Sequence, residues 1–419
     1  MFETLRNAWK IDDLRKKIIY TLLLLLVYRI GTFVPVPGVD RAFIAEMVSR
    51  FGILGLLDII NGSSLSNFTI FAMGITPYIN ASIIMQLLTV AIPKLEALAK
   101  EGEEGRKKIA QYTRYFAVVL AFIQSIGIIL GLGRGAVIEA SFWNYLTIGL
   151  TLTAGTAFII WLGERITENG IGNGMSLIIF VGIIARLPVL VVQTVQGLIA
   201  QTIQFWMILL IILGTLIMVA GVVFVDLGQR RIPIQYAKRM VGRKMYGGQS
   251  THIPMKVNSS GVLPLIFAIS FVSFPGMITQ FWPNSAFSLW YNKYLGTGTV
   301  AYGIIYALLI IGFTFFYTTI TFNPVEIANN LKQYGGFIPG IRPGKPTSDY
   351  LSRISNRITF FGAIFLALVA VLPMIFTNIT GMQSPFGATG ILIVVSVALE
   401  TTKQIEAQML MRHYRGFLK

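Results

Sequence analysis

The chain has 419 residues, of which 54% are apolar and 12% charged, and its formal net charge is +16. Because an ordinary soluble domain carries about a quarter charged residues, this composition excludes a typical soluble enzyme and indicates a membrane protein. The absence of cysteine excludes disulfides, thiolate metal sites and thiol nucleophiles. The two histidines, His252 and His413, have no companion at ligand spacing, so we expect no metal and no cofactor.

Ten apolar stretches are long enough to cross a bilayer, since about 20 helical residues span roughly 30 Å of hydrocarbon. In chain order they are 18–34, 71–92, 114–132, 144–163, 174–194, 205–225, 258–281, 301–322, 358–377 and 386–409. With the amino terminus inside, the inner segments hold 27 Lys and Arg, leaving Lys403 aside, and the outer loops hold four: Arg41, Arg50, Arg134 and Lys293. Loops rich in Lys and Arg stay in the cytoplasm. We therefore predict an all-α polytopic membrane protein with both termini cytoplasmic.

The predicted spans divide equally between residues 1–200 and 201–419, five in each half. Because five is odd, the second half enters the membrane from the opposite side, as in an inverted repeat. In each half the second span is interrupted by Pro, Gly and polar residues. Interrupted spans at matching positions point to a central pathway, although Pro and Gly are also common in ordinary membrane helices. The pattern leaves these two readings about equal.

The segment 53–67 precedes the first interrupted span. Its apolar run from Ile53 to Ile60 is too short to cross the membrane, and the polar stretch from Asn61 to Asn67 then breaks it. Such a segment is usually interfacial or re-entrant. It is either a plain helix of an outer loop or a plug that folds into an outer vestibule.

Two predicted inner loops are unusually long. The loop 226–257 and the loop 323–357 carry pairs or series of basic residues interleaved with aromatic ones, such as Tyr236 and Tyr334. Retention on the inner side explains the charge alone, but long loops are more often functional. We interpret these two loops as a docking surface for a cytoplasmic partner.

Other functional classes fit the residues less well. Gly344-Lys345 resembles the end of a phosphate-binding loop, but Pro339 and Pro346 occupy its first Gly and its Ser/Thr positions. A secondary transporter would place charged residues near the midplane, whereas most intramembrane charges here fall towards span ends. An intramembrane protease ranks third because no catalytic set assembles. We therefore predict that the chain is not an enzyme.

Five strings, in order along nearly the whole chain, resemble the bacterial SecY family of translocon subunits. They are TPYINASI from Thr76, EGRKKIAQYTR from Glu104, GIGNG from Gly170, QSTHIP from Gln249 with Lys256-Val-Asn258, and FIPGIRPG from Phe337. Each string alone is a weak signal, but the ordered set is specific. The resemblance implies an hourglass channel that passes unfolded polypeptides across the membrane or releases them sideways into lipid.

The resemblance also implies roles for particular residues. The apolar pore ring falls on Ile75, Ile79, Met175, Ile179, Ile266 and Ile393. The facing positions of a lateral gate are Asn80 and Phe274. The plug residues are Ile53, Leu54, Leu56, Leu57, Asp58, Ile59 and Ile60. The residues that contact a motor or the ribosome are Arg342, Arg243, Lys244, Lys238 and Arg239.

The residues themselves support part of this assignment. Ile75 and Ile79, like Met175 and Ile179, are spaced i, i+4, so each pair shares a helix face. Without the resemblance, all six ring residues would be ordinary packing residues. A ring of aliphatic side chains seals a pore by dewetting, and Met175 stands where the family usually has Ile.

The implied partners are SecE and SecG as channel subunits, the SecA ATPase, the ribosome, signal peptides and unfolded client polypeptides. Anionic lipids suit the basic inner loops. The implied location is the bacterial inner membrane. Because the chain has no nucleotide site, its energy source must be external.

Overall fold

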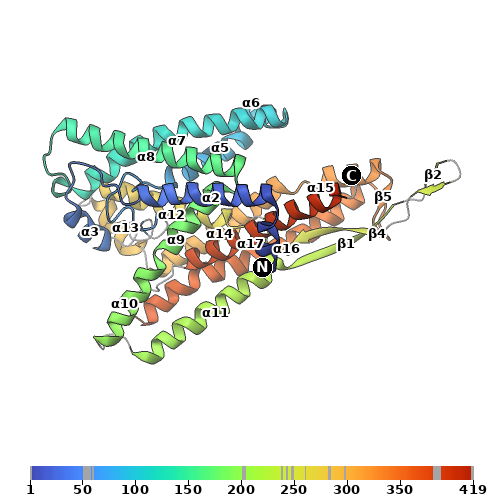
Figure 1. Ribbon diagram of the computed structural model, residues 1–419. Coiled ribbons are helices and arrows are strands. Elements are labelled where there is room, and N and C mark those ends of the chain that lie inside the picture. Colours follow the sequence, from blue (N-terminus) through green and yellow to red (C-terminus); the bar gives the residue numbers. More distant parts are fainter. Residues whose placement is uncertain are drawn as a thin grey trace.

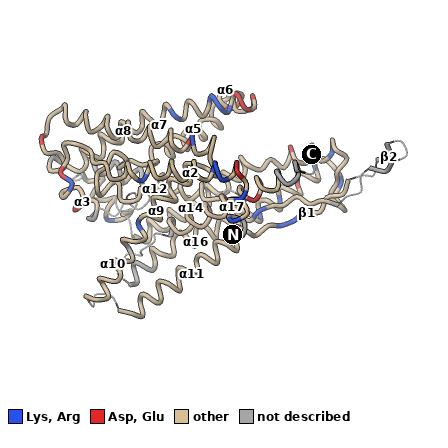
Figure 2. Tube along the Cα trace, viewed as in Figure 1, with Lys and Arg blue, Asp and Glu red and all other residues tan. Residues whose placement is uncertain are grey.

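The computed structural model describes residues 2–50, 58, 61–200, 204–236, 239–241, 244–246, 250–259, 261–281, 285–296, 299–380 and 388–416. Long helices run side by side along the molecule, and the two ends of the chain lie at the same end of it (Figure 1). Lys and Arg are numerous at this end, on the first turns of the first long helix, on the β-strands and near the carboxyl terminus (Figure 2).

The described helices of the first half include one or two in each of its five predicted spans, with shorter helices outside them. They are α1 (Phe2–Trp9), α2 (Asp12–Gly31), α3 (Arg41–Arg50), α5 (Thr76–Ala91), α6 (Pro93–Lys100), α7 (Glu103–Leu132), η1 (Arg134–Ala136), α8 (Phe142–Asn169), α9 (Gly174–Ala185) and α10 (Leu187–Ile199). The second span begins later than predicted, because residues 71–75 form turns and α5 starts at Thr76 with Pro77 in its first turn. The fifth span is divided at Arg186, just before Pro188.

The described part of the second half also consists mainly of helices. They are α11 (Phe205–Leu227), α12 (Leu263–Phe281), α13 (Ala286–Tyr294), α14 (Val300–Thr321), α15 (Pro324–Gln333), α16 (Lys345–Thr380) and α17 (Ala388–Gly416). Pro275 lies inside α12, as the interrupted sequence indicates. Residues 258, 259, 261 and 262 are not helical, so this span is also shorter than predicted.

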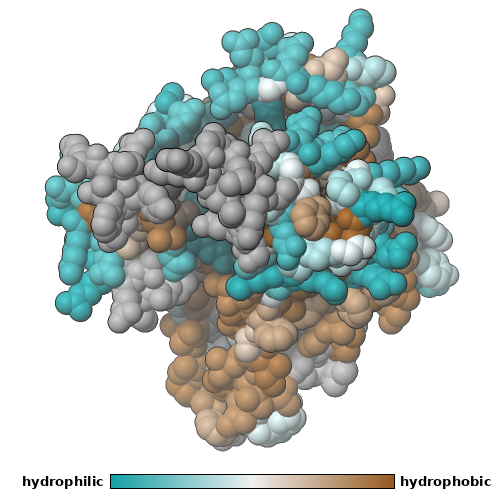
Figure 3. Space-filling view, turned by 90° about the vertical axis from the view of Figure 1, so that its right-hand side faces the viewer, coloured by the Kyte–Doolittle hydropathy of each residue, from teal (hydrophilic) through white to brown (hydrophobic). Residues whose placement is uncertain are grey.

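Among the described residues, six helices are long and apolar enough to cross a membrane, or seven if the bent pair α5 and α6 forms one span. The two members of that pair meet at 100°. At the end of the molecule that holds the termini, the surface is mostly hydrophilic, and the flank below it, over α10 and α11, is apolar (Figure 3). The prediction of an all-α polytopic membrane protein is confirmed.

The two long inner loops meet in a small sheet that the sequence analysis did not expect. β1 (Gln229–Tyr236) pairs antiparallel with β4 (Ser250–Lys256), and β5 (Gly336–Phe337) pairs with the other edge of β1. A separate ribbon joins β2 (Arg239–Val241) to β3 (Lys244–Tyr246). Below the larger sheet, Ile232 and Met255 pack with Ile338, Leu351 and Ile354. Loops from positions about 100 residues apart thus form one body.

The two halves touch through few pairs of helices. α12 packs against α5 and α7, and α17 packs against α9. Within the halves, the strongest packing is α5 with α7, α7 with α8, α12 with α14, and α14 with α16. The largest apolar cluster lies where the halves meet, and it contains residues of α5, α9, α12 and α17.

Candidate functional site

The six residues assigned to the pore ring lie in one apolar cluster. Ile75 is the residue before α5 and Ile79 lies in its first turn, Met175 and Ile179 lie on α9, Ile266 on α12 and Ile393 on α17. Ile75, Ile179, Ile266 and Ile393 are buried, and Ile79 and Met175 are half-buried against them. Each half of the chain contributes two helices. Met175 also contacts α8. Its sulfur lies close to the position that a Cβ on Gly163 would occupy.

The start of α9 is fixed by a side-chain cap. The Asn173 side-chain oxygen accepts hydrogen bonds from the backbone N–H groups of Met175 and Ser176 at 3.1 and 3.3 Å. Such a cap satisfies N–H groups that a helix leaves unpaired at its first turn. It fixes Met175 at the first turn of α9, beside the polar residues of the GIGNG string.

A cavity of about 480 Å³, lined by both polar and apolar residues, lies directly beside the cluster. It is lined by residues within one helical turn of the ring: Ser176, Leu263 and Ser396. Its charged lining residues are Asp226, Lys256, Glu400 and Lys403. The apolar cluster therefore forms the floor of a water-accessible cavity.

The cavity contains a network of buried and partly buried polar groups. The sequence analysis did not predict it. The Asp226 carboxylate accepts hydrogen bonds from the Asn258 side-chain amide at 2.8 Å and from the Ser396 hydroxyl at 2.6 Å. Lys403 donates to the Asp226 backbone carbonyl at 3.4 Å. These contacts join the carboxyl end of α11 to the middle of α17 and to the segment before α12. The signal in the sequence is one acidic residue at the end of an otherwise apolar span.

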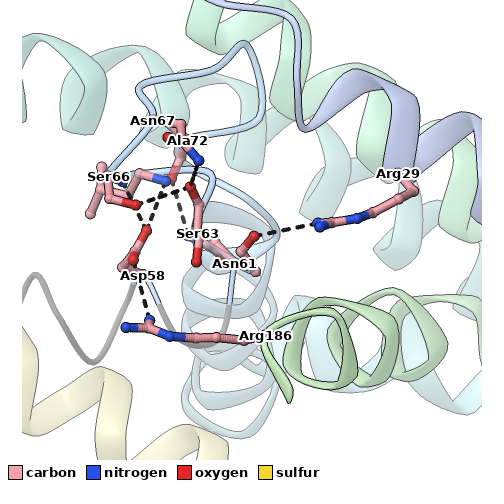
Figure 4. A network of polar contacts seen from close by, with 10 residues as sticks. Arg29, Asp58, Asn61, Ser63, Ser66, Asn67, Ala72 and Arg186 are labelled. Carbon is pink, nitrogen blue, oxygen red and sulfur yellow. Dashed lines mark hydrogen bonds and ion pairs between the residues drawn. The ribbon is translucent and has the colours of Figure 1, made fainter. Parts of the chain in front are cut away.

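On the other side of the cluster, the described part of the predicted plug is tied down by a polar network (Figure 4). The Asp58 side chain, 4% exposed, accepts backbone hydrogen bonds from Leu65 and Ser66 at 3.1 and 2.8 Å. Its second oxygen pairs with the Arg186 guanidinium at 3.2 Å. Burial raises the pKa of the Asp58 carboxyl, against the opposing effects of the Ser66 hydrogen bond and of Arg186.

Two further contacts hold this segment, one to the turns before α5 and one to α2. The Asn61 side-chain amide donates to the Ala72 carbonyl at 3.1 Å, and Arg29 of α2 donates to the Gly62 carbonyl at 3.5 Å. Gly62 has φ +63°, and a Cβ there would stand 2.9 Å from the Gly182 carbonyl of α9. The close approach therefore requires glycine. The predicted plug residues Ile53, Leu54, Leu56, Leu57, Ile59 and Ile60 lie outside the described residues.

The predicted gate helices α5 and α12 are in contact. Asn80 is half-buried on α5. Phe274 lies on α12, and its side chain is outside the described part of the structure.

The predicted docking residues are only partly described. Arg342 is exposed between two glycines with positive φ, Gly340 and Gly344. Its backbone carbonyl accepts a hydrogen bond from the Thr347 hydroxyl at 2.8 Å, which ties the turn to the start of α16. Arg239 and Lys244 lie on the β2–β3 ribbon, and Lys238 and Arg243 lie outside the described residues.

The whole sequence was compared with protein families. The model of the SecY family matches residues 69–402. The chain belongs to the SecY family. The protein translocase subunit SecY of Halalkalibacterium halodurans is 49% identical over all of both chains. The resemblance noted from the five strings is thereby confirmed.

Solved structures show the same fold. A structure described as a protein-conducting channel has a TM-score of 0.69 and 20% identity, with 94% of this chain and 92% of that chain covered. Sec61 in the canine ribosome–channel complex from the endoplasmic reticulum has a TM-score of 0.63 and 18% identity, with the same shares covered.

Proposed function

We propose that the chain is the channel subunit of a bacterial translocon, which passes unfolded polypeptides across the inner membrane and releases membrane segments sideways into lipid. It supplies a conduit and no enzymatic step. One observation carries the proposal: the order of contacts along α9. Ser176 lines the cavity, Ile179 lies in the apolar cluster, Gly182 touches the plug segment, and Arg186 pairs with Asp58.

Along α9, the cavity is therefore followed by an apolar constriction and then by the plug segment. A partly polar cavity admits a hydrated chain, and a ring of aliphatic groups excludes water and ions while offering the chain no hydrogen-bond partner. The ring is Ile75, Ile79, Met175, Ile179, Ile266 and Ile393, and the segment 53–67 closes its far side as a plug. Because each half supplies two of the four ring helices, residues 1–200 and 201–419 act as two halves around the channel.

The lateral exit lies between α5 and α12, with Asn80 and Phe274 at its facing positions. These helices belong to different halves and touch directly. A polar contact between membrane helices is worth about 0.6–2 kcal/mol, which is weak enough for a signal peptide to open the seam.

We place both termini and the small sheet on the cytoplasmic face, because 27 Lys and Arg fall in the inner segments and four in the outer loops. The body formed by β1, β4 and β5 is the docking surface for the SecA ATPase and the ribosome, with Arg342, Arg243, Lys244, Lys238 and Arg239 as contacts. Support comes from the similar Sec61 fold in a ribosome–channel complex. SecE and SecG complete the channel, and anionic lipids face the basic loops.

Crosslinking tests the pathway directly, because the chain contains no cysteine. A precursor with one cysteine is halted in transit through vesicles that carry Ile179→Cys channels. Oxidation should join precursor and channel by a disulfide. The matched control is Ile159→Cys on α8, which is buried in the same cluster but outside the ring. Equal crosslinking of both variants, or of neither, would refute the pathway.

A further inference from the structure

Helix α13 presents an aromatic face that the proposed pathway does not use. Phe287, Trp290 and Tyr294 are spaced i, i+3, i+7 and so share one side of the helix. Their rings lie in series: the Phe287 and Trp290 rings stack with centroids 6.4 Å apart, and the Tyr294 ring is tilted against Trp290 at 6.1 Å. Trp290 and Tyr294 are each 51% exposed and Phe287 is 48% exposed. The Lys293 ammonium lies 5.2 Å from the Tyr294 ring centroid.

The neighbouring side of α13 is fastened to α12. Tyr291 is 3% exposed, and its hydroxyl donates to the Val272 carbonyl at 3.2 Å. In a regular helix the Val272 carbonyl accepts the Gly276 N–H. The Tyr291 hydroxyl therefore bonds a carbonyl that belongs to the hydrogen-bond ladder of α12.

The contact lies within one turn of Pro275. Proline has no N–H to bond the Phe271 carbonyl, and its ring disturbs the preceding turn. A second contact supports the attachment: the Ser288 hydroxyl donates to the Thr279 carbonyl at 3.5 Å.

The attachment sets the depth of α13 in the bilayer. Gly276 is five residues before the end of α12 at Phe281, so the contact lies roughly 8 Å inside that helix end. Interfacial helices lie about 5–10 Å deep, at the boundary of head groups and acyl chains. In Figure 1, α13 lies at the end of the molecule opposite the termini.

The residue types on the aromatic face, and the apolar surface next to it, indicate what covers this face. Trp and Tyr gather at membrane interfaces because their rings are apolar and their N–H and O–H groups are polar. Lys293 supplies a positive charge for a lipid phosphate. On α12, Phe271 is 55% exposed and packs against Phe313 of α14, so an apolar, lipid-facing surface lies within one helical turn of the Val272 contact.

We propose that the face formed by Phe287, Trp290, Lys293 and Tyr294 docks into the phospholipid head-group region of the outer leaflet. Tyr291 then connects α12 to this anchor. The docking goes beyond the proposed function and does not require that α12 be a gate.

Fluorescence quenching tests the docking in the intact complex. All tryptophans except Trp290 are replaced by Phe, and the complex is reconstituted into phosphatidylcholine vesicles with bromine on the acyl chains. Bromine near the head-group end should quench Trp290 more strongly than bromine near the chain end, and aqueous iodide should quench it weakly. A matched control moves the indole across α13, with Trp290→Phe and Asn292→Trp, because Asn292 lies on the other flank of the buried Tyr291.

The outcomes are distinct. Shallow quenching of Trp290 above that of the control supports docking. Strong iodide quenching with weak bromine quenching overturns it and indicates water or a soluble protein on this face. If the multiple replacement does not assemble, Trp290→Cys with a nitroxide label gives the same decision, because oxygen marks a lipid site and a water-soluble nickel chelate an aqueous one. Neither measurement depends on polypeptide translocation. A negative result would therefore contradict the lipid docking of α13 without contradicting the proposed channel function.

Discussion

Asp58 and Arg186 are 128 residues apart in the chain, yet their side chains form an ion pair at 3.2 Å. Arg186 stands at the break between α9 and α10, and Asp58 belongs to the proposed plug. The Asp58 side chain is 4% exposed and that of Arg186 is 26% exposed. The pair therefore connects the plug to the helix that also carries Met175 and Ile179.

Removing the cation alone should unseat the plug. Arg186→Gln leaves the buried Asp58 carboxylate without its partner, at a cost of about 3 kcal/mol, the lower end for buried pairs because Arg186 is partly exposed. We expect a raised resting ion current in planar bilayers. The double variant Arg186→Gln with Asp58→Asn should leak less than the single one. Arg165→Gln, which breaks an exposed pair with Glu168, is the control and should leave the current unchanged.

The seal should also depend on pH. Burial raises the pKa of Asp58, so the seated plug holds the proton more tightly than a plug released into water. The contribution of Asp58 to the closed state is therefore complete below its ordinary pKa, and it is lost as pH rises through the raised value. Resting current should fall when the outer solution is acidified through this window. Asp58→Asn should abolish that dependence, and an unchanged pH profile would contradict the buried position.

Polar ring residues should wet the constriction. Ile79→Ser with Ile179→Ser places hydroxyls where the proposed ring excludes water, so resting current should rise. Truncating a buried isoleucine costs about 2–5 kcal/mol of stability wherever it lies. Ile159→Ser, buried in α8 of the same cluster, controls for that loss and should not conduct. Equal currents in both proteins would show that the ring is ordinary core.

A covalent bond across the gate should stop transport. Asn80→Cys with Phe274→Cys should form a disulfide on oxidation if the two Cα atoms lie within about 4.4–6.8 Å. Docking energies of a few kcal/mol cannot open such a bond. Export into vesicles should cease on oxidation and return on reduction. In either single variant, oxidation should leave export unchanged. Efficient crosslinking with undiminished export would place the gate elsewhere.

Reversing the charge of Arg342 should uncouple the motor. Arg342 is exposed, so Arg342→Glu should fold normally and abolish export driven by SecA. Lys345→Glu makes the same charge change three residues away, at the start of α16, and should retain most export. Assays use inverted vesicles with matched amounts of channel. Normal export by Arg342→Glu would remove the assignment.

The sequence predicted what depends on local pattern. Apolar runs and the distribution of Lys and Arg are local, so helices occupy all ten predicted spans. Residues 71–75 are apolar but not helical, because Phe68 and Gly74 have positive φ and a helix cannot continue through such residues. A hydropathy pattern does not report these backbone angles. The split at Arg186 was missed for a related reason, since Pro188 fits the first turn of a new helix.

Long-range contacts were beyond such patterns. Asp226 and Ser396 are 170 residues apart, and neither residue has a spacing that indicates the other. The pairing of β5 with β1 was hidden in loops recognised only by charge and length. For the ring, i, i+4 spacing linked Ile75 to Ile79 and Met175 to Ile179. Only the family resemblance linked those pairs to Ile266 and Ile393.

Helix α11 differs from its neighbours in a way that bears on biogenesis. Every residue of α11 is described, Val222 is the one that is buried, and the helix is the most apolar of the six membrane-length helices. A helix that suits lipid on nearly all sides is stable in the bilayer before it packs. α8, the least apolar of the six and more than half buried, depends on its neighbours. During synthesis α11 would thus insert by itself and pack against α17 afterwards, where the hydrogen bond between Asp226 and Ser396 joins the two helices.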